Sequence, residues 1–215
     1  MNEPEYIDMV ESSQLSLQDF FVKYHRSIPE EMKYSTKVGL NITVDDNVYS
    51  YQKVKLKVGG NNSRTYAKLG FNLKLSKQTF FGRNNLRLRS DYTDISHIRS
   101  KLAVDLINKW NIPTVQVTYA NLYINNKYFG FYMLLDAIKP NWIRDIYNLP
   151  EEQEVKTLYS CSAQTLAFNP DVVKSVCQNE KEEYLNYTKP LHDMIDEVIF
   201  PTKFRDKKKS LIMQK

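Results

Sequence analysis

The sequence contains no apolar run of the about 18 residues that a membrane-spanning helix requires. Its amino terminus, Met1-Asn2-Glu3-Pro4-Glu5, also lacks the basic and apolar regions of a secretory signal peptide. The sequence therefore predicts a chain without a transmembrane segment and without a signal peptide of its own.

Cysteine is scarce, because Cys161 and Cys177 are the only two among 215 residues. They form no Cys-x-x-Cys pair, and no group of histidines lies near them, which argues against a structural zinc site. In an exported protein the pair could form a disulfide worth on the order of 3 kcal/mol. In a reducing compartment both would be buried thiols, and the sequence leaves the two states open.

The motifs of common nucleotide-binding and hydrolytic sites are also missing. The six glycines form no Gly-x-x-x-x-Gly-Lys-Ser/Thr loop, no dinucleotide-binding triplet and no Gly-x-Ser-x-Gly elbow. His25, His97 and His192 lie far apart, without an evident serine or cysteine partner. Since no Asp-x-Asp or His-Arg-Asp pattern is present to hold magnesium, the sequence alone predicts no metal ligands and identifies no catalytic residue.

The overall charge is mildly basic. The 30 Lys and Arg residues against 25 Asp and Glu give a formal net charge of +5, which is too small to indicate nucleic-acid binding by itself. The hydrophobic content of 42% supports a globular core in one domain or in two closely packed lobes. The end of the chain, 201–215, contains Lys207-Lys208-Lys209 and is predicted to be a flexible basic tail.

Alternation of apolar and polar residues predicts several strands in the amino-terminal half. These strands are Thr36 to Val44, Tyr49 to Val58, Thr65 to Ser76 and Leu86 to Arg89. Residues Glu5 to Lys23 precede them with an imperfect helical pattern, which predicts one helix or two short ones.

The centre of the chain predicts a helix followed by a hairpin. Five apolar residues recur at steps of three and four, which places them on one face of a helix that packs by this side. They are Ile95, Ile98, Leu102, Leu106 and Trp110. Two alternating strands, Thr114 to Ile124 and Tyr128 to Leu135, follow and meet at Asn125-Asn126, which suits a tight turn. Together these patterns predict an α+β fold with a mostly antiparallel sheet and a packed helix.

Six cations are expected on one face of this sheet, because they alternate with apolar residues. They are Lys53, Lys55, Lys57, Lys74, Arg87 and Arg89. One interpretation is a solvated outer face, since edge strands often carry lysines that discourage pairing between sheets. The other is an anion site, because like charges repel and these strands hold few carboxylates. The glycine pair in Gly59 to Arg64 is either a plain turn or a loop that aims amide groups at phosphate oxygens, and we expect a phosphate-bearing ligand.

Several stretches resemble the CotH kinase family, the spore-coat protein H group, in residues, order and spacing. They are Gly59 to Lys68, Phe71 to Leu75, Phe81 to Arg83, Asp94 to Ala103 and Leu122 to Tyr132. The resemblance extends from Glu5 to Ile199 and is strongest for eukaryotic relatives of the anaerobic-fungal type.

The resemblance implies an atypical, two-lobed protein-kinase-like fold that uses ATP and Mg²⁺ to phosphorylate serine or threonine on spore-coat or surface proteins. The kinase-like domain would span residues 5–200, and the phosphate-bearing ligand would be ATP. A secreted, cell-surface or spore-coat location and a protein substrate or surface partner are implied in the same way.

The same resemblance makes four residues candidates for binding the nucleotide. Arg64 and Lys68 fall in the family's Gly-x-Ser-Ser-x-x-x-Lys stretch. Lys74 lies in the strand that follows, where cations would meet the triphosphate. Asp136 stands where bacterial members usually have Glu.

The family's Asp-x-Ser-x-x-Arg helix start is matched by Asp94, Ser96 and Arg99, for which we expect a capping role rather than catalysis. Family members continue past the last helical pattern, Leu191 to Val198, into an Asp-x-Asp segment that is expected to supply metal ligands. This chain has no such segment. The resemblance therefore predicts a truncated domain with an incomplete second lobe and little or no kinase activity.

Three functions follow from these observations, in order of preference. The first is a CotH-type kinase lobe that binds ATP. The second is a non-catalytic, invasin-like adhesion protein of the same family at the cell surface. The third, a nucleic-acid-binding protein, is not favoured by the modest charge and would show binding that weakens steeply with salt.

Overall fold

The computed structural model describes residues 1–76, 78–161 and 170–199. The chain divides into two compact units, Met1–Leu149 and Pro150–Lys215, and each is described by itself.

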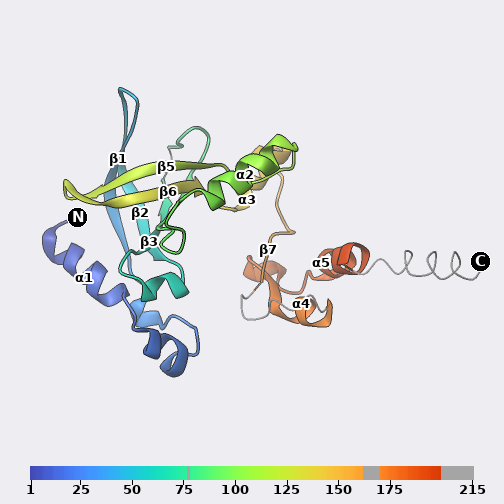
Figure 1. Cartoon of the computed structure of the whole chain (residues 1–215). Helices are drawn as coiled ribbons and strands as arrows, with labels where there is room; N and C mark the ends of the chain where they lie inside the picture. The colour runs from blue at the N-terminus through green and yellow to red at the C-terminus, as the bar shows by residue number, and fades with distance from the viewer. Residues whose placement is uncertain (77, 162–169, 200–215) are drawn as a thin grey trace, which may run out of the picture. The chain divides into compact units, whose positions relative to one another are not determined.

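The first unit is built on a six-stranded antiparallel sheet with the strand order β1-β2-β3-β4-β6-β5. In Figure 1 the tip of the β1–β2 hairpin projects beyond the rest of this sheet. The strands are β1 Ser35–Val44, β2 Asn47–Gly59, β3 Gly70–Lys74, β4 Asn85–Arg89, β5 Val117–Ile124 and β6 Lys127–Asp136. The predicted α+β class with a mostly antiparallel sheet is confirmed.

One predicted strand starts later than expected. Residues Asn62–Thr65 form a turn of 3₁₀ helix (η3), and β3 begins only at Gly70. The prediction of a strand from Thr65 was wrong because the Thr65 hydroxyl donates to the carbonyl oxygen of Asn62 at 2.8 Å, which stabilises a turn instead.

Helical segments lie before the first strand, between strands and after the last strand of the sheet. In the first unit they are α1 Glu3–Ser13, η1 Asp19–Lys23, η2 Glu30–Met32, η3, α2 Arg99–Lys109 and α3 Pro140–Tyr147. Helix α1 begins with a capping box, because the Asn2 side chain accepts from the Glu5 amide at 2.8 Å and the Glu5 carboxylate accepts from the Asn2 amide at 3.0 Å. The amino-terminal pattern thus forms two helical segments, α1 and η1, as one of the two predicted alternatives.

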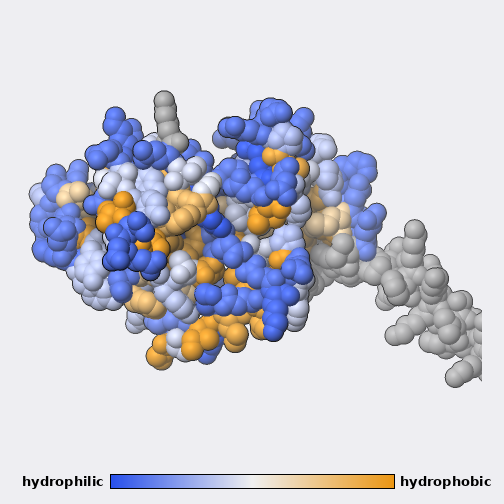
Figure 2. Space-filling view, turned by 90° about the horizontal axis from the view of Figure 1, so that it is seen from above, coloured by the Kyte–Doolittle hydropathy of each residue, from blue (hydrophilic) through white to orange (hydrophobic). Residues whose placement is uncertain are grey.

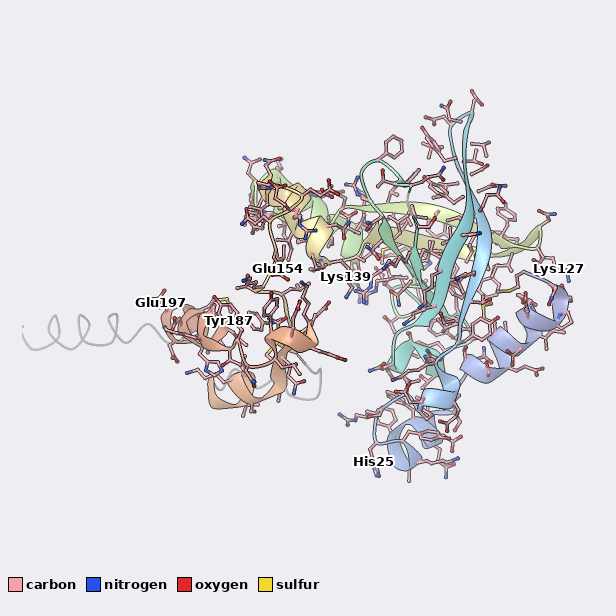
Figure 3. All side chains as sticks on the ribbon, turned by 180° about the vertical axis from the view of Figure 1, so that it is seen from behind. His25, Lys127, Lys139, Glu154, Tyr187 and Glu197 are labelled. Carbon is pink, nitrogen blue, oxygen red and sulfur yellow. A yellow bond between two sulfur atoms is a disulfide. The ribbon has the colours of Figure 1, made fainter. Side chains whose placement is uncertain are left out.

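The main core lies against the inward side of β2, β3, β4 and β6. Its largest fully buried side chains are Tyr132, Phe71 and Met9, the last from α1. The Tyr132 hydroxyl donates to the carbonyl oxygen of Leu69 at 2.7 Å, so its polar end is satisfied inside the core. Lys127, at the start of β6, donates to Glu3 of α1 at 2.8 Å and ties the helix to the hairpin (Figure 3).

A bulge interrupts the β1–β2 ladder. Val38 pairs with Val54 and Leu40 pairs with Tyr51, so β2 has one residue more than β1 between these pairs. Tyr51 and Val54 are both buried, whereas Gln52 and Lys53 between them are both exposed. Lys53 continues the outward alternation of Lys55 and Lys57, and the extra residue lets Gln52 face outward as well.

Helix α2 forms, but it begins only at Arg99, so Ile95 and Ile98 of the predicted face precede it, and none of its side chains is fully buried. The apolar residues of the predicted face are exposed, with Ile95 at 96% and Trp110 at 67%, and Figure 2 shows hydrophobic residues at the surface in several places. The half-buried side chains of the helix include Val104 and Ile107. The prediction was wrong because periodicity identifies an apolar stripe, whereas the neighbouring strand, here β5, decides which stripe is covered.

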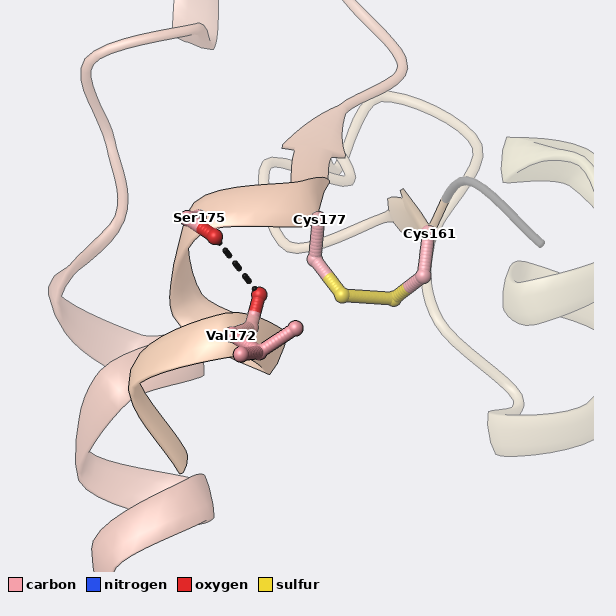
Figure 4. Close-up of a disulfide and its surroundings, with 4 residues drawn as sticks. All are labelled: Cys161, Val172, Ser175 and Cys177. Atoms are coloured by element: carbon pink, nitrogen blue, oxygen red, sulfur yellow. Dashed lines mark hydrogen bonds between the residues drawn. A yellow bond between two sulfur atoms is a disulfide. The ribbon is translucent and has the colours of Figure 1, made fainter. Parts of the chain in front are cut away.

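The second unit contains a short antiparallel pair, β7 Tyr159–Cys161 and β8 Cys177–Asn179. A disulfide joins Cys161 to Cys177 across this pair (Figure 4). Of the two states that the sequence left open, the structure has the disulfide.

Helical segments complete the second unit, and they are α4 Pro170–Val176, η4 Glu182–Tyr184, α5 Lys189–Met194 and η5 Ile195–Ile199. Its small core contains Cys177, Leu191 and Ile195. No helix in the described ranges of either unit is long and apolar enough to cross a lipid bilayer. The predicted tail, 201–215, lies outside the described residues.

A candidate anion-binding pocket beside the glycine loop

Two glycines leave part of the outer sheet face without side chains. Gly59 at the end of β2 and Gly70 at the start of β3 are direct partners in the ladder. A Cβ atom on Gly59 would lie 2.5 Å from Nδ2 of Asn72, and one on Gly70 would lie 3.2 Å from the carbonyl oxygen of Leu88. Only glycine therefore fits at Gly59 without displacing its neighbour.

A cavity of about 430 Å³ opens above this bare surface. We call residues Gly59–Ser63 the glycine loop and this cavity the glycine-loop pocket. The pocket is lined by the glycine loop, by parts of β3 and β4, and by the segment after β4. The lining residues are Gly59–Ser63, Tyr66, Gly70–Asn72 and Arg87–Thr93. The volume lies within the range of about 300–1,000 Å³ of small-molecule sites.

The glycine loop contains a glycine in a left-handed conformation. Gly60 has a φ of +82°, and a Cβ atom there would lie 1.9 Å from Oγ of Ser63. The backbone conformation thus favours glycine, and any other residue would also require the Ser63 side chain to move. The loop closes into η3, and Asn61, Asn62 and Ser63 line the cavity.

Arg64, a predicted nucleotide ligand, stabilises this loop through hydrogen bonds to backbone carbonyl oxygens. Its guanidinium donates from Nε to the carbonyl oxygen of Gly60 at 3.1 Å, from Nη2 to that of Val58 at 3.0 Å and from Nη1 to that of Met32 at 2.6 Å. The side chain is 2% exposed, and burial lowers the pKa of the guanidinium. The structure thus gives Arg64 a structural role, while direct contact with a nucleotide stays a prediction.

Lys68, the second predicted ligand, does not line the cavity but contacts Ser90, which does. Its ammonium group donates to the carbonyl oxygens of Ser90, at 3.1 Å, and of Phe131, and it lies 4.7 Å from the centre of the Tyr132 ring. Burial lowers the pKa of Lys68, and the negative charge of Asp91 partly opposes this effect. Lys68 therefore connects the residue after β4 with β6.

Arginines of β4 supply the positive charge of the pocket. Arg87 and Arg89 are exposed and line the cavity, and no ion pair involves either of them within the described ranges. Arg87 donates from Nε to Oδ1 of Asn72 at 3.1 Å, which orients the guanidinium across the ladder. Lys74, the third predicted ligand, follows Asn72 by two residues on the same sheet face but does not line the cavity.

Asp91 is the acidic residue in the lining, and the sequence interpretation missed it. Its Oδ2 atom is shielded from solvent and has no hydrogen-bond partner in the described part of the chain. Its backbone is left-handed, with a φ of +44°, which is costly for a residue other than glycine. The available signal was its position two residues after the β4 pattern, since functional side chains often lie on the loops that follow strands.

Two tyrosines in the lining stack on each other. Tyr66 and Tyr92 stack with their ring centres 4.8 Å apart and their planes 18° apart. Both line the pocket, Tyr66 from the segment after η3 and Tyr92 from the segment after β4.

Asp136, the fourth predicted ligand, lies away from this pocket. Its carboxylate is buried, forms an ion pair with Arg83 and accepts from the Gln116 amide at 2.8 Å. It lines a second, mostly apolar cavity of about 250 Å³ beside Phe80 and Phe81. The structure thus places Arg64 and Lys68 next to the glycine-loop pocket, Lys74 farther along the same face, and Asp136 in another cavity.

The Asp94 motif caps the approach to α2, as expected. Asp94 accepts from the Ser96 hydroxyl at 2.6 Å and from the Arg99 amide at 2.9 Å. These hydrogen bonds, led by that of Ser96, lower the pKa of Asp94. In the part of the chain that the structure describes, no three histidine, cysteine, aspartate or glutamate side chains come together as ligands for a metal ion.

Comparison with known proteins identifies the family. A sequence model described as CotH kinase protein matches residues 56–212, which is more than half of the chain. Invasin CotH3 of Rhizopus delemar is 33% identical over 93 residues, which are 42% of this chain and 16% of that protein. The chain thus spans only a small part of the length of this relative. On the strength of the family match, the chain belongs to the CotH kinase protein family.

Proposed function

We propose that the glycine-loop pocket binds the phosphate groups of ATP and that the chain is a CotH-type atypical serine/threonine kinase domain for surface or spore-coat proteins, with little or no transfer activity of its own. The observation that carries the proposal is the bare floor at Gly59 and Gly70 with Arg87 beside it. Such a floor lets a phosphate approach the backbone, and arginine is well suited to bind it in a fork of donors.

The arrangement of elements supports a kinase-like lobe. Helix α2 lies between β4 and β5 in the chain, and the connection after β6 leads directly to α3. The glycine loop lies at one end of the sheet, and the connection from β6 to α3 leaves from the other end. The first end would bind the phosphates of a nucleotide, and the second would bind its base. We propose this orientation, with the phosphates near Arg87 and Arg89.

The residues around the pocket fit a nucleotide better than they fit a metal ion alone. Magnesium bound with ATP would neutralise charge on the transferred phosphoryl group. Asp91 is the one carboxylate among the residues that line this pocket, which is too few to hold a magnesium ion without the phosphates. Since phosphoryl transfer depends on several positioned groups, we propose nucleotide binding with little or no transfer by these residues alone.

A second candidate is a non-catalytic adhesion protein at the cell surface. It is supported by the similarity to a protein named Invasin CotH3. Under this proposal the chain is exported, and the Cys161–Cys177 disulfide is consistent with an oxidising compartment. Labelling of intact cells with an antibody against the chain tests this location, and a signal found only after permeabilisation contradicts it.

The nucleotide proposal is tested by calorimetric titration of the chain with ATP, with and without Mg²⁺. We expect saturable binding that Arg87→Ala weakens about tenfold or more, because a charge-assisted hydrogen bond contributes about 1.5–3 kcal/mol. Lys109→Ala, which removes the same charge from the exposed end of α2, is the matched control and should bind as the unchanged chain does. Lys74→Ala tests the predicted contact of that residue with the triphosphate in the same assay. Equal affinity of the Arg87 and Lys109 variants would reject the pocket.

A further inference from the structure

Three lysines face one another across three neighbouring strands. Lys37 of β1 is the direct partner of Lys55 of β2, and Lys55 is the direct partner of Lys74 of β3. All three are exposed. Since direct partners in an antiparallel ladder point to the same side, these side chains form one row across the outer face of the sheet, which we call the lysine row.

The usual reason for lysines on a sheet explains only one member of this row. Lysine on an edge strand discourages pairing with another sheet, and β1 is the edge strand here. Lys55 and Lys74, however, lie on the interior strands β2 and β3, whose edges are already paired. Like charges placed directly opposite one another destabilise a sheet, so the two interior lysines carry a cost that edge protection does not explain.

No carboxylate of the described ranges neutralises the row. None of the ion pairs there involves Lys37, Lys55 or Lys74. Lysines elsewhere in the chain do find acidic partners, such as Lys101 with Asp105 and Lys127 with Glu3. The row is therefore a distinct feature and not the general condition of lysine in this protein.

The next row along the strands continues the positive face. Lys57, Asn72 and Arg87 are successive partners across β2, β3 and β4. Asn72 and Arg87 line the glycine-loop pocket, whereas no member of the lysine row does. The lysine row thus adjoins the pocket without being part of it.

We infer that the lysine row is a docking surface for an acidic segment of a partner protein, one with a short run of Glu or Asp residues. Two steps between neighbouring strands span about 10 Å, which suits three or four carboxylates. Single-stranded nucleic acid is the less favoured occupant, because its binding sites combine cations with aromatic side chains for stacking. Neither the lysine row nor the row of Lys57, Asn72 and Arg87 contains an aromatic residue.

This inference goes beyond the proposed nucleotide binding and does not require it. An acidic segment on the row would lie next to the pocket, so a protein substrate could be held there with a hydroxyl-bearing residue near the nucleotide. The docking itself is electrostatic, and we expect it to weaken with salt. It can be measured in the absence of ATP, which separates its failure from the failure of the nucleotide proposal.

The test is fluorescence anisotropy with a labelled peptide of six consecutive Glu residues at low salt. The variant Lys37→Gln/Lys55→Gln/Lys74→Gln should bind the peptide about tenfold more weakly, because it loses three ion pairs of modest strength. The control Lys23→Gln/Lys33→Gln/Lys109→Gln removes the same charge from exposed positions outside the row and should retain the affinity. Equal losses in both variants would mean attraction by net charge only and would overturn the inference.

Two further measurements make the result decisive. An oligothymidine of equal charge should bind more weakly than the peptide, and tighter, row-dependent binding of the oligonucleotide would assign the surface to nucleic acid instead. Thermal unfolding of the row variant should occur at an equal or higher temperature, because the substitutions relieve repulsion. If the triple variant does not fold, Lys55→Gln alone must still weaken peptide binding, and unchanged binding would reject the docking surface.

Discussion

Arg83 and Asp136 lie 53 positions apart in sequence and form an ion pair in which the carboxylate is buried and the guanidinium reaches solvent. The other carboxylate oxygen accepts from the backbone amide of Gln116 at 2.8 Å. The Asp136 side chain, at the end of β6, thus contacts both the turn before β4 and the segment before β5. This geometry gives Asp136 a structural function whether or not it also contacts a ligand.

Replacing Asp136 by Ala should lower the free energy of unfolding of the first unit by about 3 kcal/mol, because a buried donor and a cation lose their partner. Urea unfolding measures the change. Asp105→Ala, which breaks the exposed pair with Lys101, should cost less than about 0.5 kcal/mol. Similar decreases in the free energy of unfolding in the two variants would show that the Arg83–Asp136 pair stabilises the unit no more than an exposed ion pair does.

Replacing Arg64 by Met should destabilise the first unit by about 3 kcal/mol, because several buried carbonyl oxygens lose their donor. The glycine loop should also become a site of rapid cleavage by protease, since Arg64 holds it to Val58 and Met32. Urea unfolding and limited proteolysis measure both effects. A variant that keeps its stability but loses ATP binding would instead favour the predicted direct contact of Arg64 with the nucleotide.

Replacing Gly59 by Ala should weaken ATP binding about tenfold and cost about 1–2 kcal/mol of stability, since the new Cβ enters the pocket floor and displaces Asn72. Gly39→Ala is the control, because a Cβ there meets its nearest atom, the carbonyl oxygen of Tyr51, at 3.9 Å. Calorimetry and thermal unfolding should separate the two variants. Unchanged ATP binding by the Gly59 variant would place the nucleotide elsewhere.

Hydrogen bonds from Lys181 and Tyr184 lower the pKa of Glu154 in the second unit to about 2. Because the folded-state pKa lies below the ordinary value of 4.5, the ionised carboxylate stabilises the unit above pH 4.5, and this contribution is lost as the pH falls toward 2. NMR titration of the Glu154 carboxyl carbon measures the pKa. Lys181→Met should move it back toward 4.5, and an ordinary pKa in the unchanged chain would contradict the network.

The sequence predicted the strands well where one side of the sheet faces the core. Alternation of residues found β1, β2, β4 and the β5–β6 hairpin, because burial on one face imposes a period of two. It also predicted cations on one outer face, and the ladder places Lys55, Lys74 and Arg87 there.

Other features could not be predicted because they depend on contacts between distant segments. The carbonyl groups that bind Arg64 come from separate parts of the chain, and no local pattern marks them. The covered face of α2 depends on its contact with β5. Asp91 was missed since a single acidic residue after a strand is common, and only the enclosed, unpartnered oxygen distinguishes it.

The bulge in β2 makes this strand tolerant of a change in length at one point. If either Gln52 or Lys53 were deleted, Tyr51 and Val54 would still face inward on a regular ladder, because two exposed residues now stand where one suffices. A deletion at Leu56 would instead turn Lys55 or Lys57 toward the core. Natural insertions and deletions in this strand should therefore gather at the bulge, and the spacing from Val54 to the glycine loop should stay fixed across species.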